Sequence, residues 1–157
     1  MINEQVKCTG DVQGIIEYKS GKIEIIEFPN TVLATGRQSL AAGIANEIGD
    51  QFQGYISRML FGDGGTSGGS TKFVSSSRNG LFGVTRAAKP VISKVDPNIL
   101  TRVVFTSVIP FDEANGYPLN EMALKMANGD LYSMVTFPDL NKTSQMQLTF
   151  NWNLNFI

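Results

Sequence analysis

The last thirteen residues of the chain, 145–157, alternate between polar and apolar side chains more regularly than any other stretch. A period of two is typical of a half-buried β-strand, because successive side chains point to opposite faces of a sheet. At about 3.3 Å per residue this strand would span about 40 Å, roughly twice the common length in a globular domain. Its apolar positions are Met146, Leu148, Phe150, Trp152, Leu154 and Phe156. The pattern predicts a β-rich fold with a core on one side of this strand.

The polar face of the same strand has amides and a hydroxyl but no charge. Its residues are Gln145, Gln147, Thr149, Asn151, Asn153 and Asn155. Edge strands usually carry Lys, Pro or a bulge that blocks unwanted pairing, so an uncharged terminal strand is typical of one that is paired or covered. Two interpretations follow. The strand either pairs with another subunit, with Gln147, Asn151, Asn153 and Asn155 as interface residues, or it is a central strand of the chain's own sheet.

Turn signals divide the rest of the chain into short extended segments. Residues 12–28 read as a hairpin around Lys19-Ser20-Gly21, and residues 119–138 read as a second hairpin. The turn of the second is Asn128-Gly129, a pair that favours a type I′ turn with positive φ angles. Further extended segments are expected at 52–61, 81–85, 89–95 and 101–109. We therefore predict one mainly β domain over residues 1–157, a β-sandwich or barrel-like fold of about seven to nine strands with one α-helix packed against it.

The helix is expected at residues 36–48. Thr35 and Gln38 have the spacing of a capping box, and Gly49 is a suitable stop. An apolar stripe lies near one face of the segment and is expected to pack on the sheet. It consists of Leu33, Leu40, Ile44 and Ile48.

A glycine-rich loop follows at residues 62–70. Gly64 and Gly69 have the spacing of a phosphate-binding loop, but Ser70-Thr71 stand where that motif needs Lys followed by Ser or Thr. No apolar helix follows to supply an anion-binding N-terminus. We therefore expect a flexible connection that adapts to neighbouring subunits, not a nucleotide site.

The residues that carry most enzyme chemistry are scarce. The chain has no histidine, and its only cysteine, Cys8, excludes an internal disulfide. Asp112 and Glu113 are adjacent, so on a strand they would point to opposite faces. Glu121 could accept bonds from a basic partner, although solvation is the commoner fate of a Glu side chain, and Asp63 lacks nearby oxygen ligands for calcium. We expect no catalytic, cofactor-binding or metal-binding residue.

Charge is unevenly distributed along the chain. The net charge is −1, which argues against general nucleic-acid binding. Residues 54–102 hold seven Lys or Arg against Asp63 and Asp96, and each flank has a net charge of −3. Such a division could orient neighbouring copies, with Arg58, Arg78 and Arg86 at the subunit interface, or the charges could be scattered and solvated. Because no apolar run suits a membrane and no signal peptide opens the chain, we expect a protein made in a cytoplasm or assembled there.

Several short motifs resemble the N-terminal attachment domains of phage tail-collar and tail-fibre proteins. They are Arg58-Met59-Leu60-Phe61-Gly62-Asp63-Gly64, Asn120-Glu121-Met122-Ala123-Leu124, Asn128-Gly129-Asp130-Leu131-Tyr132 and the alternating last strand. In that family a strand ends in a Gly-Asp-Gly turn after the first helix, and a Glu-hydrophobic strand leads through a short turn into a second arm. The similarity covers residues 12–157.

This resemblance implies a non-enzymatic structural protein of a phage virion, assembled in the host cytoplasm. Such a protein would dock copies of itself, fibres or neighbouring tail proteins in the tail, collar or baseplate. Family members usually continue into a stalk, whereas this chain stops at Ile157, so we expect an adaptor. The alternatives are a capsid decoration protein and, from another class, a carbohydrate-binding module. The single Trp152 lies in the apolar stripe, which favours a core position over a sugar platform.

Overall fold

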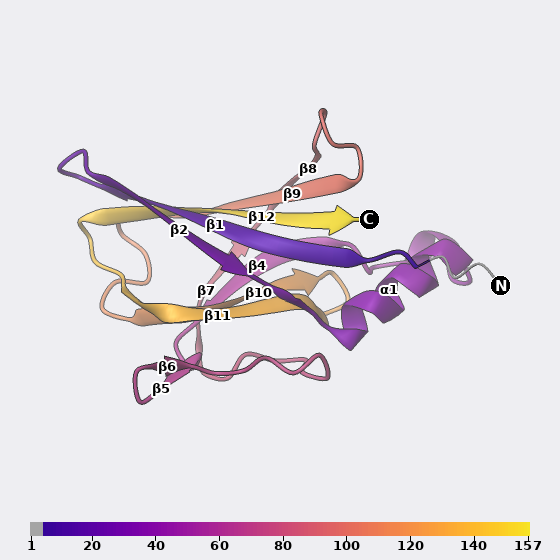
Figure 1. Ribbon diagram of the computed structural model, residues 1–157, viewed down its shortest axis with the longest axis horizontal. Coiled ribbons are helices and arrows are strands. Elements are labelled where there is room, and N and C mark those ends of the chain that lie inside the picture. Colours follow the sequence, from indigo (N-terminus) through magenta and orange to yellow (C-terminus); the bar gives the residue numbers. More distant parts are fainter. Residues whose placement is uncertain (1–4) are drawn as a thin grey trace.

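The structure, a computed structural model, describes residues 5–157 as two antiparallel β-sheets packed face to face (Figure 1). Sheet A has the order β2-β1-β12-β9-β8 and sheet B the order β3-β11-β10-β4-β7. The strands of sheet A are β1 (Cys8–Tyr18), β2 (Ile23–Pro29), β8 (Ile92–Val95), β9 (Arg102–Ile109) and β12 (Met146–Phe156). Those of sheet B are β3 (Thr31–Val32), β4 (Ile56–Gly62), β7 (Thr85–Pro90), β10 (Pro118–Met126) and β11 (Leu131–Asn141). The predicted β-sandwich with one α-helix, α1 (Ala34–Ala45), is confirmed, but residues 5–157 hold twelve strands, several of them very short, where seven to nine were expected.

The core lies between the inner faces of the two sheets. Trp152 and Phe150 of β12 are fully buried there, and the Phe150 ring lies 5.0 Å from that of Phe61 on β4. Phe28 of β2 stacks on Phe137 of β11 at 4.9 Å. Aromatic rings that bridge the sheets in this way bury much apolar area, which is the main stabilising contribution in a sandwich.

At two prolines the chain leaves a strand of one sheet and continues directly as a strand of the other sheet. β2 ends at Pro29 in sheet A and the chain continues as β3 in sheet B, while β7 ends at Pro90 in sheet B and continues as β8 in sheet A. Proline has no N–H to donate, so the ladder ends there and the chain can bend. Ser107 fixes the second crossing by donating its hydroxyl to the Pro90 carbonyl at 2.9 Å.

The outer face of sheet B is covered by a third layer. A second apolar cluster on that face joins the sheet to residues before α1 and to the 72–83 segment; it comprises Leu33, Leu60, Val74, Ala123, Leu131 and Met134. The short hairpin of β5 (Thr66–Ser67) and β6 (Ser70–Thr71) lies on the same side (Figure 1). β10 is therefore buried on both faces, which explains its almost continuous burial.

The terminal alternating segment is a central strand of sheet A. β12 pairs with β1 over its whole length and with β9 from Leu148 to Asn155. Of the two interpretations of this strand, the structure supports the central one. The expectation that β12 extends the sheet of a neighbouring subunit is wrong, because both of its edges are already paired.

The helix differs from its prediction at both ends. It runs from Ala34 to Ala45, and Thr35 is not a cap, because its hydroxyl donates to the carbonyl of Leu131 on β11. The helix ends at Asn46, whose φ of 52° is left-handed, so Gly49 opens a separate 3₁₀ turn, η1 (Gly49–Gln51). With twelve residues, α1 is too short to cross a bilayer. Within residues 5–157 there is no other helix that is long and apolar enough to do so.

The apolar stripe of this helix is only half buried. Leu33 and Leu40 contact the core, but Ile44 and Ile48 are exposed. The helix packs through its small residues instead: a Cβ at Gly36 would collide with the backbone of Tyr132. The helix face that contains Gly36 is buried because it lets the backbones of α1 and β11 approach closely. The hydrophobic pattern of the helix does not reveal this face.

Three local predictions are also corrected. Residues 62–70 hold regular structure where a plain connection was expected: they end β4 and form the β5–β6 hairpin, with Gly68 and Gly69 at positive φ. Residues 81–84 form no strand. The turn between β10 and β11 is where it was predicted, but only Gly129 has a positive φ, so it is not type I′. The Asn128 carboxamide instead accepts the N–H of Asp130 at 2.9 Å.

Candidate protein interface

The outer face of sheet A, here called the open face, holds the polar side chains of β12. Gln147, Asn151, Asn153 and Asn155 all point to this face and are half-buried between neighbouring strands. The structure thus brings together the four amide residues predicted for an interface. This follows from the strand period alone, since residues two apart share a face.

Each of these amides has a partner on an adjacent strand. Asn151 accepts the Thr106 hydroxyl at 2.8 Å, and Asn155 accepts the Arg102 guanidinium at 2.7 Å. Asn153 donates to Asp11 at 3.0 Å, and Gln147 donates to Glu17 at 3.4 Å. These cross-strand bonds hold the side chains in fixed positions, so the open face is a preorganised polar surface.

A row of mostly apolar side chains, here called the apolar row, crosses one end of the open face, with Thr149 as its one polar member. The strand registers align Ile25, Ile15, Thr149 and Val108 across β2, β1, β12 and β9. Ile25 is 60% exposed, and Val108 at the other end of the row is 39% exposed. The open face therefore offers apolar area that a protein partner could bury, beside fixed polar groups.

The predicted interface arginines do not join this surface. Arg58 is exposed on β4 of sheet B. Arg78 donates to the Gly80 carbonyl at 3.0 Å and lies 3.6 Å from the centre of the Phe82 ring. Arg86 pairs with Asp63. Two of the three guanidinium groups are therefore engaged within the chain.

Asp63 and Arg86 form an internal ion pair at the end of β4. The carboxylate accepts the Arg86 Nε–H at 2.6 Å and the Val84 N–H at 3.0 Å. Burial opposes ionisation, but these hydrogen bonds outweigh it and lower the pKa of Asp63. The guanidinium also lies 4.0 Å from the Tyr117 ring centre. Asp63 thus helps to fix the loop that contains Val84. Among residues 5–157, no group of three or more acidic or cysteine side chains is arranged to hold a metal ion.

Asn120 and Glu121 on β10 hold the glycine-rich loop, a role that was not expected from the sequence. Glu121 is fully buried and accepts three backbone N–H groups: Gly64 at 3.0 Å, Gly83 at 2.8 Å and Phe82 at 2.7 Å. The expectation of a solvated Glu121, or of one with a basic partner, is wrong. A carboxylate can be buried without a cation when several N–H groups surround it.

Asn120 completes this anchor. Its Oδ1 accepts the Gly65 N–H at 2.7 Å, and its Nδ2 donates to Asp139 at 2.9 Å. The loop comes close because it carries glycine: a Cβ at Gly65 would overlap the Asn120 carbonyl. The only hint in the sequence was a polar pair, Asn120-Glu121, directly before the apolar run Met122-Ala123-Leu124. The motifs around Gly64 and Glu121, distant in sequence, form one structural unit.

Lys142 is a second buried charged residue that the sequence did not reveal. Its side chain is fully buried and donates to Asn115 at 2.8 Å and to the Thr143 carbonyl at 3.0 Å. Burial lowers the pKa of the Lys142 ammonium group, while Asp112 and Glu113 oppose this effect. Lys142 thus ties the 111–116 loop to the end of β11.

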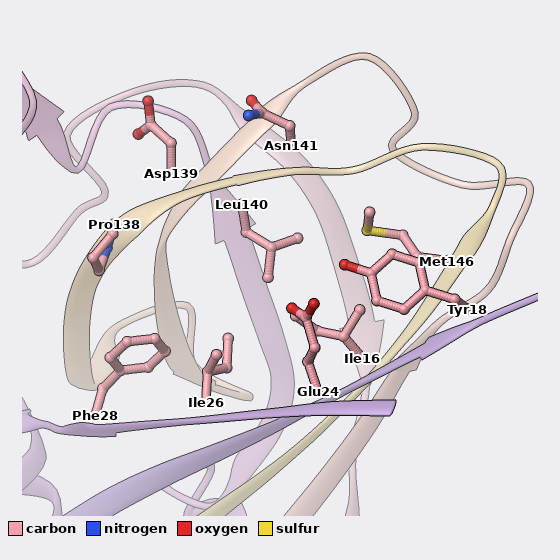
Figure 2. Close-up of a pocket in the computed structure, with 10 residues that line it drawn as sticks. All are labelled: Ile16, Tyr18, Glu24, Ile26, Phe28, Pro138, Asp139, Leu140, Asn141 and Met146. Carbon is pink, nitrogen blue, oxygen red and sulfur yellow. The ribbon is translucent and has the colours of Figure 1, made fainter. Parts of the chain in front are cut away.

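A cleft of about 400 Å³ opens between the two sheets near β2 (Figure 2). Figure 2 shows Glu24, Ile26 and Phe28 rising from β2 toward Leu140 on β11. Glu24 pairs with Lys22 at 2.7 Å, and the hydrogen bond from Lys22 lowers the pKa of Glu24. The apolar floor can hold an aliphatic side chain, whereas the two carboxylates nearby are already engaged, Glu24 by Lys22 and Asp139 by Asn120 and Thr66.

Comparisons with models of known protein families, with curated proteins and with solved structures found no match for this chain.

Proposed function

We propose that this protein is a non-enzymatic structural subunit of a phage virion, an adaptor in the tail, collar or baseplate. In this role it binds copies of itself and neighbouring virion proteins. The proposal takes its direction from the motifs that resemble tail-collar and tail-fibre attachment domains. The observation that carries it is the contact between two of those motifs: Glu121 binds the N–H of Gly64 in the Gly62-Asp63-Gly64 turn.

This contact explains physically why the two motifs contain glycine at one position and glutamate at the other. A buried Glu that holds a Gly-Asp-Gly turn requires glycine at the turn and a carboxylate at the start of the partner strand, at the spacing seen here. Those residues are thus engaged in maintaining the fold, and the open face remains available for binding. Its fixed amides and its apolar row suit contact with another protein.

The runner-up is a capsid decoration protein, which would use the same surface at another place on the particle. The interpretation as a carbohydrate-binding module loses its main support, because Trp152, the candidate sugar-binding residue, is fully buried in the core. Sugar platforms need an exposed aromatic ring.

The test is to detect the chain in purified phage particles by mass spectrometry and to locate it with gold-labelled antibodies. Label at the tail or collar supports the adaptor, and label over the capsid supports the decoration protein. Absence of the chain from intact particles would overturn both.

A further inference from the structure

The two outermost strands of sheet A have complementary edges. β2 and β8 each pair with a single neighbour within residues 5–157. The exposed charge on β2 is acidic, Glu27, whereas that on β8 is basic, Lys94. Both edges also expose isoleucine: Ile25 is 60% exposed and Ile92 is 76% exposed. An open strand edge with exposed apolar side chains is a template for pairing with another chain.

The direction of the strands determines how a second copy can add to this sheet. Each neighbouring pair in sheet A is antiparallel, so four reversals separate β2 from β8 and the two run in the same direction. A copy placed alongside in the same orientation would bring its β2 next to β8 as a parallel pair. Figure 1 shows β8 at the upper margin of the molecule, apart from α1 and the β5–β6 hairpin.

The faces of the sheet then limit the register. Ile25 aligns with Thr149 through Ile15, and Ile92 aligns with Asn151 through Thr106. Thr149 and Asn151 share the open face, so Ile25 and Ile92 do as well, and Glu27 and Lys94 follow two residues later on the same face. One parallel register therefore places Ile92 beside Ile25 and Lys94 beside Glu27.

Pairing of identical edges is less favourable. Two β2 strands related by a twofold axis through Glu27 would place the two Glu27 side chains opposite each other, and two β8 strands related by an axis through Lys94 would bring their Lys94 residues together. Like charges on adjacent strands destabilise the pair. The charges thus favour a head-to-tail contact, in which different surfaces of the two copies meet.

We propose that copies of this protein join head to tail by pairing β8 of one copy with β2 of the next, in the register that aligns Ile92 with Ile25 and Lys94 with Glu27. This inference rests on the proposed function and deepens it by naming the surfaces through which copies meet. A contact of two strand edges is small, so association of the isolated protein is weak and strengthens when other virion proteins hold the copies side by side. The ion pair mainly selects the register.

Disulfide trapping tests the register directly. In a Cys8→Ser background, Ile25→Cys and Ile92→Cys would lie about 4.8 Å apart across the new strand pair, within disulfide range. The matched control combines Ile23→Cys with Ile92→Cys, which keeps Glu27 and Lys94 but leaves the two Cα atoms about 8 Å apart, beyond that range. Mild oxidation of the first variant should give a ladder of covalent oligomers, and the control should stay monomeric. Equal cross-linking in both variants would overturn the inference.

Charge exchange provides a second test that needs no cross-link. Glu27→Lys and Lys94→Glu should each weaken self-association about tenfold in sedimentation measurements at low salt. Mixing the two variants should restore association, because each interface of an alternating assembly again joins Lys to Glu. Glu47→Lys, near the C-terminal end of α1, is the control and should behave as the wild type. Failure of the mixture to recover would contradict head-to-tail pairing.

The two proposals fail in different ways. If both edge tests fail while the chain is found in purified particles, the edge pairing is wrong and the adaptor role stands. If the chain is absent from particles, the adaptor role falls whatever the edges do.

Discussion

The buried carboxylate of Glu121 lies 3.0 Å from the backbone nitrogen of Gly64 and joins the middle of sheet B to the glycine-rich loop. The same carboxylate binds the N–H groups of Phe82 and Gly83, so one side chain fixes two loops. Removing this side chain's charge should therefore loosen both loops together.

Glu121→Gln tests this anchor with little change in shape. An amide replaces one carboxylate oxygen by an NH₂ group, which would face a backbone N–H and leave it without an acceptor. We expect a loss of about 2–3 kcal/mol in the free energy of unfolding, measured by urea denaturation. The control Glu47→Gln, an exposed position, should change it by less than about 0.5 kcal/mol. Equal losses would show that Glu121 has no special role.

Gly65→Ala tests the close approach of the loop to β10. A methyl group at this position overlaps the Asn120 carbonyl, so the loop must move away from its anchor. We expect a loss of at least about 2 kcal/mol in unfolding free energy. Gly80→Ala is the matched control, because no atom lies within 4 Å of its added methyl and its φ is not in the left-handed range. That change should be neutral or stabilise the protein by up to about 1 kcal/mol.

The stability of the protein should fall in acid. The pKa of Asp63 is lowered in the folded state from its ordinary value of 3.8, as is that of Asp139, which accepts hydrogen bonds from Asn120 and Thr66. Below 3.8 the unfolded chain binds more protons than the folded one, so the unfolding free energy decreases as the pH falls through the folded pKa values.

This pH dependence can be assigned by substitution. In Asp63→Asn the unfolding free energy at pH 7 should be lower, and its decrease between about pH 4 and pH 2 should be smaller than in the wild type. Thermal unfolding at several pH values measures both quantities. An unchanged acid slope would mean that Asp63 does not contribute to it.

Trp152 and Asn153 are neighbours in sequence that face opposite sides of β12. Trp152→Ala removes a fully buried ring and should lower the free energy of unfolding by about 3–5 kcal/mol, whereas Asn153→Ala on the open face should lower it by less than about 1 kcal/mol. Urea denaturation of the two variants measures both values.

Deleting residues 152–157 should unfold the domain, because β12 is paired on both sides. A folded, unassociated deletion variant would contradict the central position of this strand. Tryptophan fluorescence of the intact protein should also be insensitive to added oligosaccharides.

The sequence by itself determined those features that depend on near neighbours. Alternation over residues 145–157 marked a strand, its apolar face and the burial of Trp152, because the side-chain period of a strand is local geometry. Gly21 and Gly129 marked the turns of both hairpins, since few other residues adopt positive φ readily. The β-sandwich class followed from the number of such segments.

Only the tertiary structure decided which segments lie next to one another. Nothing within residues 145–157 specifies that β1 and β9 flank β12, so the strand's central place was one of two open interpretations. Glu121 is buried because Gly64 and Gly83 supply N–H groups from about 40 to 60 positions away in the chain. Contacts between distant parts of the chain also decide the sheet crossings at Pro29 and Pro90. They likewise decide that Ile44 is exposed. Burial, pairing and polar satisfaction depend on partners distant in the chain, whereas local patterns report only backbone geometry and side-chain direction.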